Sequence, residues 1–182
     1  MSLRIAISGS AGTGKTTLGK RLATELGLPF IEEGMRDRIE AGLKLNALSR
    51  AERQALIEEL WIEQFAREEA ASDGFVVDRS SFDYAAFWLH YDFHIDRDTT
   101  DEWMERMISA AARYDHVLLL PWGVLPLEHD GVRSTNRWTQ FRYQSLLEGF
   151  LGRFATGAQV VRVPGTSELE DRVRSVLRAL GA

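Results

Sequence analysis

The chain of 182 residues contains no cysteine. It therefore cannot form a disulfide, hold zinc through thiolates or use a cysteine nucleophile, and this composition fits a reducing compartment best. It also lacks an apolar run of the roughly 20 residues that a membrane helix needs, and its N-terminus shows no signal-peptide pattern. We expect a cytoplasmic protein that has no membrane partner.

An excess of positive charge is missing too. The formal net charge is −5 at pH 7, whereas proteins that bind nucleic acids generally carry a basic patch. We therefore expect a small-molecule partner and no nucleic acid. Hydrophobic residues make up 45% and charged residues 27% of the chain, which is typical of a folded protein. At this length we expect residues 1–182 to form one domain; the oligomeric state is left open.

Short apolar runs alternate with helical periodicity along the whole chain. Strands are expected at residues 3–8, 29–33, 75–78, 117–120 and 160–163, of which 29–33 is the weakest signal. Helices are expected between them and after the last. This alternation predicts an α/β protein with three αβα layers and a mostly parallel five-stranded sheet, whose ligands gather at the carboxyl ends of the strands.

Three helix starts carry capping signals. Ser49 to Glu52 and Ser167 to Glu170 both have the capping-box spacing, in which a serine side chain and an acidic side chain satisfy backbone N–H groups reciprocally. Asp98 is the expected cap of the helix that precedes the fourth strand. These signals predict where the three helices begin.

Residues 9–16 read Gly-Ser-Ala-Gly-Thr-Gly-Lys-Thr, which is the P-loop pattern. Its glycines let backbone N–H groups wrap around phosphates, its lysine would place a positive charge on the β and γ phosphates, and the hydroxyl of Thr16 would coordinate Mg²⁺. The loop follows the first expected strand and opens the first helix, as its mechanism requires, which disfavours a glycine-rich turn without a ligand. The residues expected to bind MgATP are Gly9, Gly12, Thr13, Gly14, Lys15, Thr16 and Thr17.

Two classes of P-loop protein fit the sequence poorly. GTPases use Asn-Lys-x-Asp to recognise guanine, and neither this pattern nor Asp-x-x-Gly occurs in the chain. Hydrolytic ATPases usually place a glutamate after the aspartate that ends a central strand, whereas Asp78 is followed by Arg79. These absences favour a small-molecule kinase.

Four segments together resemble the ribosylnicotinamide-kinase-like group of P-loop ATP-binding proteins. They are the P-loop, Glu32-Glu33-x-x-Arg36, Asp78-Arg79-x-x-x-Asp83 and the arginine-rich stretch after residue 130. The resemblance covers nearly the whole chain, although the P-loop is its one specific motif. It implies the P-loop NTPase fold and transfer of the γ-phosphoryl group of ATP to a nucleoside-like or nucleotide-like acceptor, without identifying that acceptor.

The resemblance also implies roles for four further side chains. Asp78 would hold Mg²⁺ or take part in catalysis, since it ends a strand beside the P-loop; the alternative is a plain turn residue. Glu33 would bind or deprotonate a substrate hydroxyl, and the alternative is a solvated glutamate. Arg36 would likewise bind the substrate or be a solvated side chain. Arg79 would either contact the substrate or pair structurally with Asp83 or Asp78.

Residues 128–142 stand where P-loop kinases carry the lid that closes over ATP. Arg133 and Arg137 are four residues apart, so a helix through both would place their guanidinium groups on the same side, where they could clamp phosphoryl oxygens. The alternative is an exposed arginine-rich helix start. Pro164-Gly165, after the last strand, resembles the loop that borders adenine, but it is also an ordinary turn.

The sequence thus favours a kinase that acts by positioning and charge neutralisation, with Lys15, Asp78, Arg133 and Arg137 as its catalytic residues. A regulatory P-loop ATPase and an ATP-binding module without turnover remain as alternatives.

Overall fold

The computed structural model describes residues 2–126, 136–155 and 159–182. Five parallel strands form one sheet in the order β2-β3-β1-β4-β5, which confirms the predicted fold class. The strands are β1 (Leu3–Ser8), β2 (Phe30–Ile31), β3 (Gly74–Asp78), β4 (His116–Leu119) and β5 (Gln159–Arg162). In the register, Ile7 of β1 lies opposite Asp78 on one side and Leu118 on the other. The strand that leads into the P-loop is therefore the central one.

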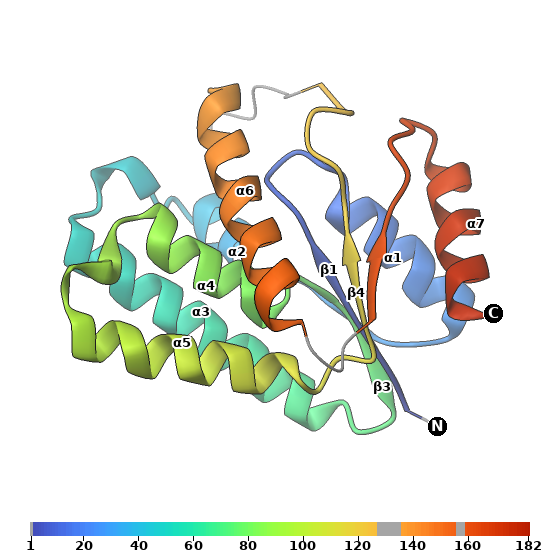
Figure 1. The fold of residues 1–182 in the computed structure, drawn as a ribbon, viewed down its shortest axis with the longest axis horizontal. Helices are drawn as coiled ribbons and strands as arrows, with labels where there is room; N and C mark the ends of the chain where they lie inside the picture. Colours follow the sequence, from blue (N-terminus) through green and yellow to red (C-terminus); the bar gives the residue numbers. More distant parts are fainter. Residues whose placement is uncertain (1, 127–135, 156–158) are drawn as a thin grey trace.

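Helices cover both faces of this sheet (Figure 1). On one face, α1 (Lys15–Leu26) and α7 (Leu169–Leu180) pack on Ile5 and Ile7 of β1. On the other face, Ala6 belongs to a larger core formed with four helices, which are α3 (Arg50–Ala70), α4 (Ser81–His90), α5 (Arg97–Ala111) and α6 (Arg137–Phe154). Successive side chains of a strand point to opposite faces, so both faces of this sheet are apolar and buried.

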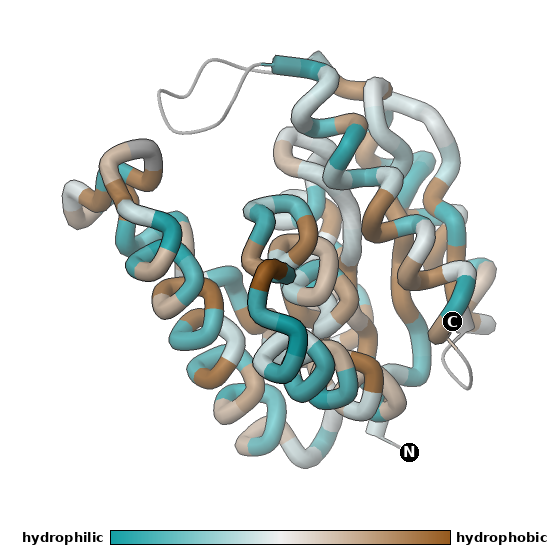
Figure 2. Tube along the Cα trace, turned by 60° about the vertical axis from the view of Figure 1, so that its left-hand side comes forward, coloured by the Kyte–Doolittle hydropathy of each residue, from teal (hydrophilic) through white to brown (hydrophobic). Residues whose placement is uncertain are grey.

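The shorter elements connect these layers. Helix α2 (Met35–Glu40) follows β2, and single 3₁₀ turns lie at Leu45–Ala47 and Phe93–Ile95. Along the outer helices, hydrophilic and hydrophobic residues alternate (Figure 2), as expected for helices that bury one side. Within the described ranges, no helix combines the length and apolar character required to cross a membrane.

One of the three predicted helix starts is confirmed and two are wrong. At α3, Glu52 N donates to Ser49 Oγ at 3.2 Å and Ser49 N donates to Glu52 Oε2 at 2.8 Å. Helix α5 begins earlier than expected, because the side chain of Asp96, not Asp98, accepts from a first-turn amide, Thr99 N, at 2.8 Å.

At α7 the predicted box between Ser167 and Glu170 is absent. The helix starts at Leu169 with Glu168 in the cap position. Thr166 Oγ1 accepts from Glu168 N at 3.2 Å instead. The hydroxyl that accepts an amide at this helix start therefore belongs to Thr166 and not to Ser167. The cap position is Glu168, one residue later than expected.

Candidate functional site

The P-loop adopts a backbone that only glycine accommodates easily. Gly12 and Gly14 have φ values of 77° and 86°, in the left-handed region that side chains rarely enter. A Cβ at Gly14 would also lie 3.1 Å from Leu125 Cδ1 and 3.2 Å from Arg172 Nη1. The backbone conformation therefore favours glycine at both positions, and the space at Gly14 is also tight.

Lys15 lies within this loop and is 6% exposed. Its Nζ donates to the carbonyl oxygens of Gly9 and Ser10, each at 2.8 Å. Burial, together with the positive charge of Arg79, lowers the pKa of Lys15 from 10.5 to about 8, although nearby carboxylates oppose this shift. The two partners of the ammonium group are neutral carbonyls. A phosphate that enters the loop would therefore give Lys15 an anionic partner.

Thr16 and Asp78 meet beside the loop. Thr16 Oγ1 donates to Asp78 Oδ2 at 2.5 Å. Asp78 is 2% exposed, and its Oδ1 is buried with no hydrogen-bond partner among the residues that the structure describes. A carboxylate oxygen and a hydroxyl are hard ligands of the kind that Mg²⁺ prefers. The pair therefore fits the predicted metal site, and a Mg²⁺ ion there would neutralise charge on bound phosphates.

Arg79, next along the chain, has a φ of 86°, which is unusual for a residue with a long side chain. Its Nε lies 2.6 Å from Glu33 Oε1, in an ion pair without hydrogen-bond alignment, and its Nη1 lies 3.4 Å from Asp83 Oδ1. Burial alone would lower the pKa of Arg79, but the surrounding groups, Glu33 first and then Tyr143, Asp83 and Asp78, together raise that pKa well above its ordinary value. Glu33, with 17% of its side chain exposed, is thus a paired carboxylate.

Asp83 is fully buried and holds several elements together. Its Oδ2 accepts from Ser8 Oγ at 2.6 Å and from Ser80 N at 3.0 Å, and its Oδ1 accepts from the hydroxyl of Tyr143 at 2.9 Å. These bonds join β1, the start of α4 and α6 at the base of the P-loop. The capping-box spacing of Ser80 and Asp83 was a sequence signal for part of this network.

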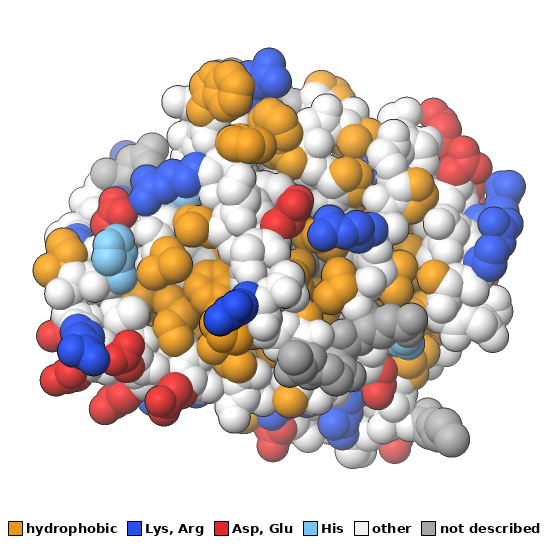
Figure 3. Space-filling model, in the orientation of Figure 1, with side chains coloured by type: hydrophobic (Ala, Val, Ile, Leu, Met, Phe, Trp, Pro, Cys, Tyr) orange, Lys and Arg blue, Asp and Glu red, His pale blue; other side chains and the backbone are white. Residues whose placement is uncertain are grey.

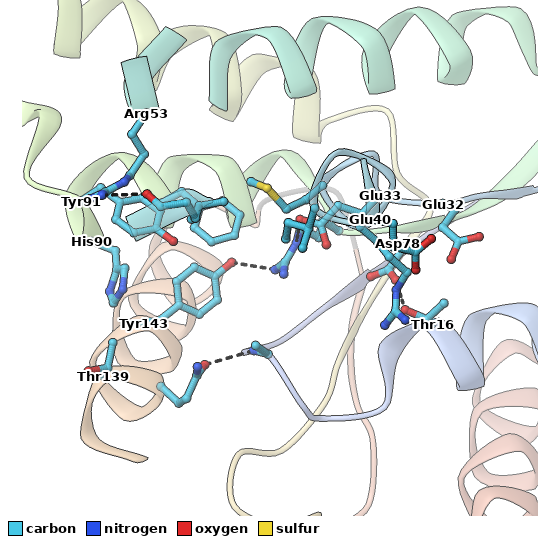
Figure 4. A pocket seen from close by; sticks show the side chains of 18 residues that line it. Thr16, Glu32, Glu33, Glu40, Arg53, Asp78, His90, Tyr91, Thr139 and Tyr143 are labelled. Atoms are coloured by element: carbon cyan, nitrogen blue, oxygen red, sulfur yellow. Dashed lines mark hydrogen bonds and ion pairs between the residues drawn. The ribbon is translucent and has the colours of Figure 1, made fainter. Parts of the chain in front are cut away.

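A cavity of about 450 Å³ opens beside the loop, between β3 and the helices α2, α3, α4 and α6. In Figure 4, Thr16, Asp78, Glu32 and Glu33 occupy one side of the view, and Arg53, His90, Tyr91 and Tyr143 the other. Phe87 and Tyr91 stack with ring centroids 5.8 Å apart, and Arg53 lies 5.2 Å from the ring centre of Tyr91. The cavity thus has an acidic end at the P-loop and an aromatic wall.

The structure brings five of the predicted site residues to this cavity. Its lining includes Thr16, Glu33, Arg36, Asp78 and Arg79. Lys15, which is absent from the lining, precedes Thr16 at the start of α1. Pro164 is exposed just after β5. The roles assigned to these residues remain predictions, but the structure places five of them around one cavity.

The predicted arginine clamp assumed one helix through Arg133 and Arg137, and the structure describes only Arg137 of this pair. Asn136 has an extended backbone and caps α6, since its side chain accepts from Trp138 N at 3.0 Å. Helix α6 therefore begins at Arg137, and Arg133 lies outside the described residues, so its role stays a prediction. The guanidinium of Arg137 lies over the rings of Trp122 and Trp138, at 5.4 and 5.1 Å. Figure 3 shows hydrophobic side chains gathered over the start of α6, where Trp138 is exposed.

Three further side chains contact the P-loop, and no pattern in the sequence indicated them. Gln144 Oε1 accepts from Ser10 N at 2.9 Å and Gln140 Oε1 accepts from Ala11 N at 3.2 Å. Arg172 donates to Thr13 O at 2.8 Å and to Thr166 O at 2.5 Å. These residues come from α6 and α7, far along the chain, so no local pattern could identify them.

Comparisons with known proteins agree with this fold. The S-adenosylmethionine-dependent nucleotide dehydratase of Lacinutrix mariniflava is 31% identical over 123 residues, which are 64% of this chain and 25% of that protein. The solved structure of NadR in complex with NR has a TM-score of 0.70 and 21% identity, over 100% of this chain and 50% of that chain. Deoxyadenosine kinase from M. mycoides has a TM-score of 0.74 and 14% identity, over 98% and 99%.

The chain thus spans a quarter of the curated relative and half of NadR, and identities this low among the solved structures show the fold alone. The family model of the AAA domain (AAA_28) matches residues 4–172, nearly the whole length. The chain therefore belongs to this AAA domain family, and its fold is that of the P-loop nucleoside and nucleotide kinases.

Proposed function

We propose that this protein transfers the γ-phosphoryl group of MgATP to a hydroxyl group of a nucleoside-like or nucleotide-like acceptor. One observation carries the proposal: a single cavity joins the P-loop to two carboxylates, Glu33 and Asp78, and to an aromatic wall. Carboxylates can orient or deprotonate a sugar hydroxyl, and aromatic rings can bind a planar base. The cavity size suits a ligand of this class.

The charges at the P-loop end favour a hydroxyl over a phosphate as the acceptor group. Arg79, a buried cation of this lining, is already paired with Glu33 and Asp83. Asp78 and Glu32 add further negative charge to the same end of the lining. An acceptor that brought its own phosphate to this end would meet carboxylates, which repel it.

The names of similar proteins are consistent with such an acceptor. NadR was solved in complex with NR, deoxyadenosine kinase was solved with dCMP and dCDP, and the curated relative is named as a nucleotide dehydratase. For this chain, we infer catalysis by positioning and charge neutralisation. Lys15 would bind phosphate oxygens, Thr16 and Asp78 would hold Mg²⁺, and Arg79 would keep Glu33 directed into the cavity.

The direct test is transfer of labelled phosphate from ATP to a panel of nucleosides and their monophosphates. We expect product with at least one nucleoside and faster turnover with nucleosides than with the matched monophosphates. GTP as donor serves as the comparison for base preference. Release of inorganic phosphate without any phosphorylated acceptor across the panel would support the regulatory ATPase instead.

The pKa of Lys15 predicts how nucleotide binding depends on pH. That pKa is about 8 in the free protein, and an adjacent triphosphate would raise it. The charged lysine therefore contributes fully below about pH 8, and its contribution is lost as the pH rises toward the pKa of the bound state. We expect the affinity for MgATP, measured by calorimetry, to fall by up to about tenfold per pH unit above pH 8.

A matched variant isolates this effect. Lys15→Arg keeps a charge that does not titrate in this range, so its affinity should stay constant over the same pH interval even if it is lower throughout. Lys44→Arg, on the exposed turn before Leu45, should reproduce the parental profile. Equal parental affinities at about pH 7 and pH 9.5 would contradict the assignment.

A further inference from the structure

The backbone of Arg79 is held on both sides of its Cα atom. Its N–H donates to Ile7 O of β1 at 2.9 Å, and its carbonyl oxygen accepts from Gln64 Nε2 of α3, also at 2.9 Å. Together these bonds hold the residue at its φ of 86°, a conformation that costs a non-glycine residue free energy and persists only where the surroundings impose it. The side chain leaves the same Cα, so the direction of the guanidinium depends on both bonds.

Gln64 is a polar residue on a buried, mostly apolar side of α3. It is 2% exposed, and the other buried residues of this helix are apolar except for Glu68, one turn later. A buried amide costs free energy unless its donors and its acceptor are bonded, so packing alone would favour a leucine at this position. The groups that the amide bonds therefore explain its presence.

Each end of the Gln64 amide has a protein partner. Nε2 donates to Arg79 O and to Glu68 Oε1, the latter at 2.8 Å, while Oε1 accepts from the hydroxyl of Tyr84 at 2.9 Å. A carbonyl oxygen only accepts, so the NH₂ group must face Arg79 O, and this fixes the orientation of the amide. Glu68 is itself held by the hydroxyl of Tyr114, which donates to its Oε1 at 3.1 Å. The network thus keeps the donor of Gln64 on the carbonyl of Arg79.

The guanidinium that this backbone directs is the one that pairs with Glu33. Arg79 Nε lies 2.6 Å from Glu33 Oε1, and Arg79 Cζ lies 4.7 Å from the ring centre of Phe87. All three of these residues line the acceptor cavity, whereas Gln64 is not part of the lining. Gln64 is therefore placed to affect the cavity through Arg79.

We propose that Gln64 is a positioning residue that holds the backbone of Arg79 in the left-handed conformation, so that the guanidinium stays on Glu33 and Glu33 stays directed into the cavity. The effect on turnover rests on the proposed function. The hold on Arg79 is a property of the free protein, and stability measurements test it alone. This inference assigns to α3 a determinant of the site that lies outside the cavity.

A double-mutant cycle on turnover separates positioning from a general structural role. Gln64→Met removes the donor at similar size, and we expect kcat to fall by roughly 10- to 100-fold because Glu33 loses its fixed direction. The KM for ATP should change much less, since none of the bonds of Gln64 reaches the P-loop. In a Glu33→Gln background the same substitution should change kcat little, because the residue through which it acts is already altered. An equal fold-loss in both backgrounds would overturn the proposal.

Two further variants complete the experiment. Gln54→Met is the matched control, because Gln54 lies on the same helix, donates to Glu58 Oε1 at 3.1 Å and is not part of the cavity lining. It should keep the parental kcat and show no coupling to Glu33→Gln. Gln64→Asn is milder than Gln64→Met, since it keeps an amide that is too short to bond both Arg79 O and the Tyr84 hydroxyl. It carries the same expectations in every measurement if Gln64→Met does not fold.

The same cycle followed by urea denaturation does not depend on turnover. If Gln64 holds Arg79 on Glu33, then Glu33→Gln should lower the denaturation midpoint by less in Gln64→Met than in the parental protein. Equal shifts in the two backgrounds would reject the hold on Arg79. Unequal shifts, together with no phosphorylated acceptor from the parental protein, would reject the proposed function and leave the hold on Arg79 supported.

Discussion

Asp78→Asn should retain the fold and most of the affinity for ATP, while lowering kcat by about 10² to 10³, or roughly 3 to 4 kcal/mol. Asparagine keeps the shape of the side chain but removes its charge. Asp78 is buried beside Thr16, and its Oδ1, which has no hydrogen-bond partner in the described part of the chain, could accept a cation or a proton from the acceptor. A negative charge in such a site acts with little screening by water.

A comparison with Glu33→Gln assigns the two carboxylates to their roles. If Glu33 is the base, its variant should show the larger loss of kcat, and Asp78→Asn should mainly raise the Mg²⁺ concentration needed for half-maximal turnover. Measurement of kcat for both variants across a Mg²⁺ titration distinguishes these outcomes. Melting curves are needed as a control, because Glu33→Gln also removes the ion-pair partner of Arg79.

Asp73→Asn is the matched control, since Asp73 is exposed just before β3 while Asp78 ends the same strand. This variant should keep parental turnover. A folded Asp78→Asn protein that also keeps parental turnover at every Mg²⁺ concentration would exclude Asp78 from the chemistry.

The second large effect is expected on stability. Asp83→Asn should lower the free energy of unfolding by about 3 to 5 kcal/mol, because it removes a buried charge that faces Arg79. The new NH₂ group would also meet groups that donate to Asp83, among them Ser80 N and Ser8 Oγ. Two donors that face each other leave buried hydrogen bonds unmade.

Urea denaturation with a fixed m-value is the appropriate measurement. Asp101→Asn provides the control, since Asp101 is exposed on α5 and pairs with Arg97 at 3.5 Å; we expect a change within about 0.5 kcal/mol. If Asp83→Asn is no more destabilised than this control, the buried network contributes less than its geometry implies.

Local patterns in the sequence were sufficient to predict the sheet and the P-loop. Strand periodicity and a contiguous motif depend on neighbouring residues, so β1, the loop and α1 were predicted in place. The edge strand β2 was expected at residues 29–33 but covers Phe30–Ile31. It pairs with β3 alone, through Phe30 and Ile31, so the other residues of the expected strand lie outside this short ladder.

The contacts that surround the loop could not be predicted in the same way. Gln140, Gln144 and Arg172 reach it from helices that tertiary packing brings near, and a glutamine within a helix has no distinctive spacing. The cavity is also a product of packing between separate helices. Glu33 and Arg79 were both singled out from the sequence, but their ion pair required the register between β2 and β3.

The central place of β1 in the sheet has a consequence for the order in which the protein folds. During synthesis, β1 emerges before both of the strands that it pairs with, since Leu3 pairs with Gly74 and Ile5 with His116. Closure of these long chain segments costs entropy before their contacts form, and parallel pairing of distant strands is slow for this reason. The phosphate loop therefore becomes fixed only after β4 has left the ribosome, and a nascent chain shorter than this should not yet retain nucleotide.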